Sequence, residues 1–455
     1  MNWVIANRLL PRLRAATYAL RGGFLVRPLV MALALGLIGG LLSWLEQAFP
    51  ALSAWVPAWL FPSRADPQVA QIILATIAAS IMTVVSIVFA ILLMTLTLAS
   101  MQFSPRILLS FVRDRVTQRT LGIFLGTFVY CMAALPAAHS YPHPFAPVAT
   151  VVCGMFLAVT CVAWLIFFIH HISQAISVNH MVDRIARETE EVIDDVMPDS
   201  ARYAYAPESV PYDNSRPETL VGSAISGYIR YVDVKHLLHV AHSYKLRVRM
   251  LRRIGHFVPA GVALFGVSPG ERLDPELAHD LRAAFDIGPT RTLQQDVEFG
   301  VIQIVDIALK AISSAVNDPS TAITCVDQLA RILIRFVSRN APVALLCEPP
   351  HVVRVIIPWI GVESLLDTAF EQIRHYSAAD IAVSLRLLRA LDDIASTSED
   401  PRIIESLAAR GRRILAGCAE RLHADQIEKL RERVGVLEAR TNPLEALSAS
   451  RALVP

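Results

Sequence analysis

Five polar residues about two thirds of the way along the chain are the best candidates for a binding site: Asp296, Glu298, Asp306, Asn317 and Asp318. Clustered carboxylates mark sites for a cation or a small ligand. They also cap helices, because a carboxylate near a helix start accepts backbone N–H groups and favours the dipole. Asp318 stands directly before Pro319, which is typical of a helix start. The sequence therefore leaves two interpretations open, a cytosolic ligand site and structural capping.

One catalytic motif occurs, since Gly266-Val267-Ser268-Pro269-Gly270 matches GxSxG. In the nucleophile elbow of serine hydrolases, the residue after the serine donates its backbone N–H to the oxyanion hole. Pro269 has no N–H, so we interpret the segment as a turn. The cysteines lack metal-ligand spacing, and no HExxH, P-loop or GxGxxG motif is present. We predict no enzyme activity, no cofactor and no metal site.

A stripe of hydroxyl side chains runs through the apolar segment 72–99. At about 100° per residue, five of them fall on one side of a helix: Thr76, Ser80, Thr83, Ser86 and Thr97. Such a stripe could line a water-filled path if several copies surround an axis. Small and hydroxyl residues also favour close packing between membrane helices, so dry packing is the alternative.

Four arginines follow that stripe: Arg106, Arg113, Arg115 and Arg119. In an oligomer they would form a basic ring at the inner mouth of a pore, which would concentrate anions. Contact with lipid headgroups explains them equally well and requires no pore.

Four apolar segments without Lys, Arg, Asp or Glu are long enough to position these groups in a bilayer: 29–42, 72–99, 121–135 and 148–169. A helix of roughly 20 apolar residues crosses the hydrocarbon core, and the two shorter segments extend through uncharged neighbours. We predict four transmembrane helices. The lack of charge within them argues against a proton-coupled transporter.

Arginines set the predicted orientation. Several precede the first segment, where no acidic residue occurs before Glu46, and Arg106 to Arg119 lie between the second and third segments. Because Lys- and Arg-rich loops stay in the cytoplasm, we place both termini inside. A cleaved signal peptide is the competing interpretation of the first segment.

Composition separates the two halves of the chain. Of 455 residues, 54% are hydrophobic and 18% charged, and most charges follow Asn179. A net charge of +2 gives no reason to expect nucleic-acid binding. We predict an α-helical membrane protein with a cytosolic α+β domain. Its parts are a membrane domain (1–175), a helical linker and loop (176–217), a β-rich subdomain (218–290), a helical subdomain (291–440) and a tail (441–455).

Two groups of motifs carry a family resemblance. The first comprises residues 83–89, 100–106 and 111–114, and the second comprises 295–300, 305–311 and 317–322. Together they resemble a bacterial family of predicted membrane proteins without an established activity. The resemblance implies an inner-membrane protein with a cytosolic C-terminal domain, and it implies no catalytic residues.

The sequence thus predicts an oligomeric inner-membrane channel, preferring anions and regulated by its cytosolic domain. Its expected partners are the lipid bilayer, further copies of itself, and an ion or small ligand at the cytosolic domain. The alternative is a membrane-anchored sensor or scaffold without transport.

Overall fold

The chain forms two compact units, Met1–Ser177 and Val178–Pro455, which we call the membrane unit and the C-terminal unit. The computed structural model describes residues 26–49, 66–102, 115–139, 144–175, 177–197, 204–205, 218–270, 273–339, 345–348 and 352–441.

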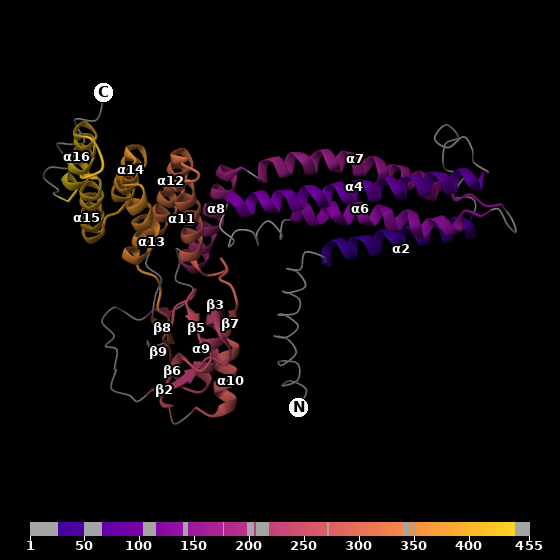
Figure 1. Cartoon of the computed structure of the whole chain (residues 1–455). Coiled ribbons are helices and arrows are strands. Elements are labelled where there is room, and N and C mark those ends of the chain that lie inside the picture. The colour runs from indigo at the N-terminus through magenta and orange to yellow at the C-terminus, as the bar shows by residue number, and fades with distance from the viewer. Residues whose placement is uncertain are drawn as a thin grey trace. The chain divides into compact units, whose positions relative to one another are not determined.

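The membrane unit consists of long apolar helices that run alongside one another (Figure 1). Among the described residues they are α2 (Val26–Ala48), α4 (Pro67–Gln102), α6 (Arg115–Ala134), the short 3-10 turn η1 (Leu135–Ala137) and α7 (Val148–Ala175). Four of these helices are long and apolar enough to cross a membrane, and the mean hydropathy of their apolar segments lies between 1.7 and 2.7. The prediction of four membrane helices is confirmed.

Glycines bring α2 and α6 into close contact. A Cβ on Gly36 or Gly39 would collide with Val129 or Tyr130 of α6. Gly122 and Gly126 of α6 likewise lie against Met31 and Leu35 of α2. Small residues permit this approach because they let the two backbones come close. Gly40, which the GxxxG spacing pairs with Gly36, meets no described atom within 4 Å, so Gly39 takes its place at the contact.

Two of the membrane helices extend beyond the uncharged segments predicted from the sequence, so that α2 includes Arg27 and Glu46, and α6 includes Arg115 and Arg119. Helix α2 continues to Ala48 and so includes Glu46, whose side chain is fully buried. Glu46 accepts hydrogen bonds from the backbone N–H groups of Ala149 and Thr150, at 2.8 and 3.0 Å, and from the Thr150 hydroxyl at 2.9 Å. The carboxylate therefore caps the first turn of α7 from another helix, which satisfies amides that a helix start leaves free.

The strands of the C-terminal unit form two sheets. Their bounds are β1 (Ala204–Tyr205), β2 (Thr219–Gly222), β3 (Gly227–Val232), β4 (Arg247–Met250), β5 (Phe257–Val258), β6 (Ala263–Ser268), β7 (Phe285–Gly288), β8 (Leu345–Glu348) and β9 (Val352–Ile356). One sheet has the order β1-β8-β9-β4-β6-β2, and the other has the order β5-β3-β7. Pairing is antiparallel except between β4 and β9. The alternating side chains of β3 and β4 bury one face, as their sequence period predicts.

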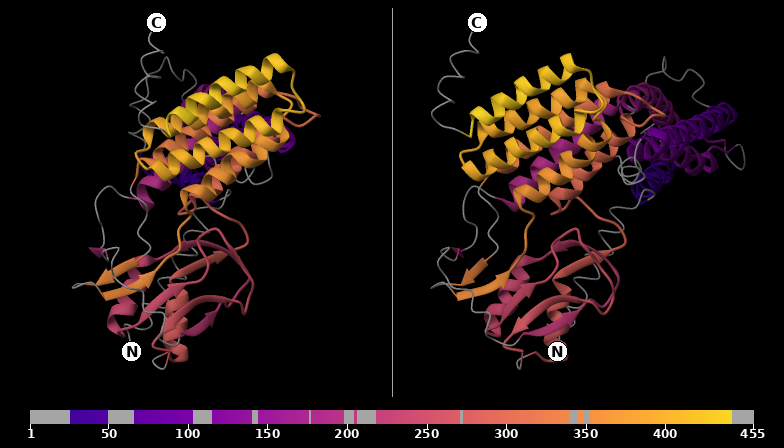
Figure 2. Two further views of the ribbon diagram at one scale, coloured as in Figure 1. Left: turned by 90° about the vertical axis from the view of Figure 1, so that its left-hand side faces the viewer. Right: turned by 60° about the vertical axis from the view of Figure 1, so that its left-hand side comes forward.

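Helices complete the C-terminal unit. They are α8 (Val178–Val196), α9 (Val234–Ser243), α10 (Pro275–Ala283), α11 (Val297–Ala311), α12 (Pro319–Val337), α13 (Val362–Tyr376), α14 (Ile381–Thr397), α15 (Pro401–Cys418) and α16 (Ala424–Ala439). Helices α9 and α10 contribute to the β-rich core, with Leu237 and Leu281 buried in it. Figure 2 shows the strands gathered in one body and the long orange and yellow helices stacked in another.

Helix α8 is part of the helical stack. Its apolar face is buried, and Thr189 lies against Gly300 of α11. Its acidic face pairs with the end of α12, where Arg335 of the helix and Arg339 just beyond it bind Asp194 at 2.7 and 2.8 Å. Contact with α11 and α12 therefore fixes this helix on two sides. The fold class predicted from the sequence, membrane helices followed by an α+β region, is confirmed.

Candidate functional site

The hydroxyl stripe of α4 lies opposite the face that packs inside the membrane unit. Ala70, Leu74, Ala78, Ile81 and Val88 are buried, whereas Thr76, Ser80, Thr83, Ser86 and Thr97 are all exposed. At 100° per residue the two sets are about half a turn apart. Among the described residues of one copy, the stripe therefore lies outside the packed face of α4.

Hydroxyls along this stripe bond to their own helix. Thr83, Ser86 and Thr97 donate to the carbonyls of Ala79, Met82 and Leu93 at distances of 3.2, 3.0 and 2.9 Å. Such bonds to the carbonyl four residues earlier satisfy the donor without a partner from another helix. The hydroxyl oxygen still has acceptor capacity that faces outward.

The predicted basic ring is described only in part. Arg106 and Arg113 lie outside the described residues. Arg115 begins α6, and Arg119, one turn further along, has an exposed side chain.

Asp296 and Glu298 come together in a network of ion pairs at the start of α11. Arg291 contacts both carboxylates, with its Nε 2.7 Å from Asp296 Oδ2 and its Nη2 3.0 Å from Glu298 Oε2. A second arginine, Arg253, binds Glu298 Oε1 at 3.1 Å. Asp296 also caps α11, because its Oδ1 accepts the N–H of Phe299 at 3.1 Å. We call Arg253, Arg291, Asp296 and Glu298 the junction cluster.

The junction cluster connects the β-rich body to the helices. Arg253 comes from the loop after β4, while the acids belong to the start of α11. Next to them, the side-chain amide of Gln295 bonds both backbone groups of Val232 at the end of β3, at 2.9 and 3.2 Å. Thr368 of α13 lies 3.4 Å from Glu298. Four segments of the chain therefore meet at this cluster: the end of β3, the loop after β4, the start of α11 and α13.

Charge and burial shift the pKa values of Arg291 in the cluster and of His256 beside it. Burial disfavours the charge on Arg291, but hydrogen bonds and charge from Asp296 and Glu298 outweigh it and raise the pKa of the guanidinium. His256 lies beside the cluster, and its Nε2 accepts a hydrogen bond from Arg253 Nε at 2.7 Å. Burial, followed by the positive charge of Arg253, lowers the pKa of His256 below 6.5. All four charged groups of the cluster are paired, and the hydrogen bond from Arg253 is made to a neutral His256 ring.

The other three predicted polar residues lie elsewhere. Asp306 sits in the middle of α11, partly buried. Asn317 and Asp318 follow the far end of α11, which at 15 residues is about 22 Å long. Asn317 adopts a φ of 49°, and Asp318 caps α12 by accepting the N–H of Thr321 at 3.1 Å. Hydrogen bonds from Ser320 and Thr321 lower the pKa of Asp318. Asp296 and Glu298 therefore lie together, and Asp306, Asn317 and Asp318 lie away from them.

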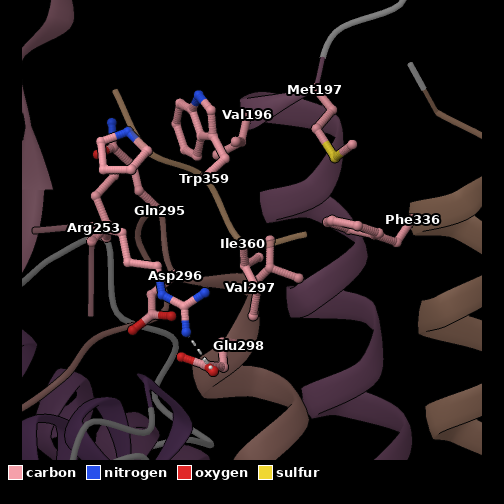
Figure 3. Close-up of a pocket in the computed structure, with 12 residues that line it drawn as sticks. Val196, Met197, Arg253, Gln295, Asp296, Val297, Glu298, Phe336, Trp359 and Ile360 are labelled. Carbon is pink, nitrogen blue, oxygen red and sulfur yellow. Dashed lines mark hydrogen bonds and ion pairs between the residues drawn. The ribbon is translucent and has the colours of Figure 1, made fainter. Parts of the chain in front are cut away.

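A small cavity borders the junction cluster (Figure 3). Its volume is about 30 Å³, enough for roughly two water molecules. Arg253, Asp296 and Glu298 form one side, and the remaining wall is mainly apolar: Val196, Met197, Ile254, Val297, Phe336, Pro358, Trp359 and Ile360.

The GxSxG match does not have the geometry of a nucleophile elbow. Ser268 ends β6 with a side chain only 2% exposed, and it precedes the cis proline Pro269. An elbow serine must present its hydroxyl at the surface. Among the described residues, no group of three or more His, Cys, Asp or Glu side chains could hold a metal ion.

Sequence reasoning missed Glu46, Arg253, Arg291 and His256. Glu46 stood just outside an apolar segment, so it was assigned to a loop. Arg253 and Arg291 are distant in sequence from each other, and only the fold brings both to the acids. Gly255 was a partial signal: it has a φ of 85°, and a Cβ there would collide with Asp296 and Arg291.

The apolar helices and the α+β C-terminal unit together define a multi-span membrane protein. More specifically, the chain belongs to the DUF2254 family of predicted membrane proteins, whose family model matches residues 21–393. It is similar to uncharacterized proteins of Mycobacterium bovis and Mycobacterium tuberculosis. Each is 31% identical over 409 residues, which cover 88% of this chain and 76% of the relative. No solved structure matches the chain. The family resemblance inferred from the motifs is confirmed.

Proposed function

We propose that this protein is an oligomeric, channel-like protein of a bacterial inner membrane, with α4 of each copy lining the path. Both termini face the cytoplasm in this proposal, and the C-terminal unit regulates opening. The observation that carries it is the outward direction of the α4 stripe. Thr76, Ser80, Thr83 and Ser86 are exposed although they lie in the most apolar of the candidate spans.

The Ser and Thr side chains of the stripe favour contact with water or with another copy of the chain over contact with lipid. An outward face rich in Ser and Thr gains less from lipid than the Phe, Ile and Val residues that dominate the exposed face of α7. Several copies arranged with α4 inward would place the hydroxyl oxygens around a common axis. The exposed Arg119, together with the other arginines between α4 and α6, would favour anions at the inner end.

Ion flux through liposomes containing the purified full chain tests the proposal. We expect chloride flux to exceed potassium flux, and Thr83→Leu to reduce it by filling the path. Thr160→Leu is the matched control, because Thr160 of α7 also bonds the carbonyl four residues earlier, at 2.9 Å from Phe156. No flux at any voltage or membrane tension, or equal loss in both variants, would refute the channel.

A membrane-anchored sensor or scaffold is the second candidate, and one observation favours it. Three stripe hydroxyls are already bonded to their own helix, so this face could also pack dry against a second copy. The two candidates differ in water access. A cysteine at position 83 or 86 should react with a membrane-impermeant thiol reagent in a channel, and should be protected in a dry interface.

A further inference from the structure

We propose that His256 is an acid-sensitive clasp between the β-rich body and the helices of the C-terminal unit. Protonation of its ring would release Arg253 from its present position and loosen the junction cluster. The inference concerns the C-terminal unit and does not depend on transport.

The hydrogen bond between Arg253 and His256 requires a neutral ring. An arginine Nε–H can only donate, so His256 Nε2 must accept at 2.7 Å, and the ring proton lies on Nδ1. A protonated imidazole has no acceptor nitrogen. Acid would therefore replace this hydrogen bond with two positive charges in contact, and either Arg253 or the ring must move.

The charged groups facing His256 are Arg252 and Arg253 from its own loop, Arg291 from the segment before α11, and Glu298 from α11. Three are positive and one is negative, so the local charge opposes protonation. Glu298 offsets this only in part, because Arg253 and Arg291 already bind its carboxylate. The ring is nevertheless partly exposed, so a proton can reach it.

The loop that carries His256 is tied to both bodies. The His256 carbonyl accepts the N–H of Ile229 in β3 at 3.1 Å, and the Gly255 N–H donates to the Ile229 carbonyl at 2.8 Å. Gly255 lies so close to Asp296 and Arg291 that no Cβ fits. A shift of Arg253 therefore acts on Glu298 directly and on the loop next to Asp296. The adjacent cavity of about 30 Å³ leaves room for this rearrangement.

The direction of the pH effect follows from the lowered pKa. When the junction opens, the pKa of the ring returns toward 6.5. The closed junction is therefore fully stabilised above pH 6.5 and loses stability as the pH falls from 6.5 toward the pKa of the closed form. Within that window the opening equilibrium rises by up to about tenfold per pH unit.

Hydrogen exchange of the full chain in detergent tests the clasp. We expect the amides of Gly255, Ile229 and Phe299 to lose protection by up to about tenfold per pH unit below 6.5, after correction for the intrinsic exchange rate. His256→Gln should remain protected, since its Oε1 can accept from Arg253 and does not titrate. His239→Gln, which removes an exposed histidine of α9, should behave like the natural protein.

Two outcomes would overturn the clasp: protection independent of pH in the natural protein, or the same acid loss in His256→Gln. If the amides of His256→Gln are already unprotected at pH 7.5, the deciding measurement is the pKa of the His256 ring in the natural protein. Exchange of its C2 hydrogen in the natural protein reports its pKa, which the clasp requires to be below 6.5. A value at or above 6.5 would refute the inference. None of these measurements depends on ion flux. Refuting the channel would therefore not refute the clasp, and refuting the clasp would not refute the channel.

Discussion

Gly255→Ala tests the geometry of the junction cluster most directly, and the chain contains a matched control. Gly255 and Gly261 have nearly the same backbone angle, with φ values of 85° and 82°. A Cβ at Gly255 would lie 2.7 Å from Arg291 Nη2 and even closer to Asp296, whereas a Cβ at Gly261 meets no described atom within 4 Å. The two substitutions therefore share backbone strain and differ in the collision.

Backbone strain and loss of the ion pair reduce the free energy of unfolding by different amounts. An L-residue in the left-handed region costs about 1–2 kcal/mol, which applies to both variants. Asp296 is 3% exposed and Arg291 16% exposed, so separating them leaves charges without full compensation in a largely dry site. Breaking a buried ion pair costs about 3 kcal/mol or more. We expect Gly255→Ala to destabilise the C-terminal unit by about 3 kcal/mol more than Gly261→Ala does.

Thermal unfolding of the full chain in detergent measures the difference. At about 2–4 °C per kcal/mol for a unit of this size, Gly255→Ala should melt about 6–12 °C below Gly261→Ala. Equal melting temperatures would show that the junction accommodates a Cβ and that the ion pairs contribute little. That result would also remove the structural basis for coupling the His256 loop to α11.

Two further predictions concern the membrane unit. Gly126→Leu should lower its stability by about 1–3 kcal/mol by pushing α6 off Leu35 of α2, whereas Gly40→Leu should not, as its Cβ meets no described atom within 4 Å. Thermal unfolding in detergent compares them, and equal effects would contradict the glycine contact. Glu46→Ala should cost about 2–3 kcal/mol because three donors at the start of α7 lose their acceptor. Glu46→Gln keeps one acceptor oxygen and should lose less, so an equal loss would argue against the cap.

Local sequence patterns predicted the elements well. The four apolar segments correspond to α2, α4, α6 and α7, because length and apolar composition are properties of each segment alone. Residues 218–290, which the sequence predicted to be β-rich, contain strands β2 to β7. Asp318 was expected at a helix start and caps α12, since capping depends only on neighbouring residues.

The sequence did not predict which residues that are distant along the chain contact one another. A helical period located the α4 stripe, but only packing determined that it faces away from α6 and α7. Likewise, five polar residues within 23 positions suggested one site, yet α11 places Asp318 about 22 Å from the start of that helix.

The sequence by itself indicated four membrane-spanning helices, an α+β region after them, and the family. It did not predict β8 and β9, which lie within residues 291–440, where only helices were expected. Only the tertiary structure decided that Glu46 caps α7, that Gly39 replaces Gly40 at the α2 contact, and that Arg253 and Arg291 hold Asp296 and Glu298. The physical reason is that periodicity and composition act over a few residues. The partners of a buried charge come from distant segments that only the fold brings together.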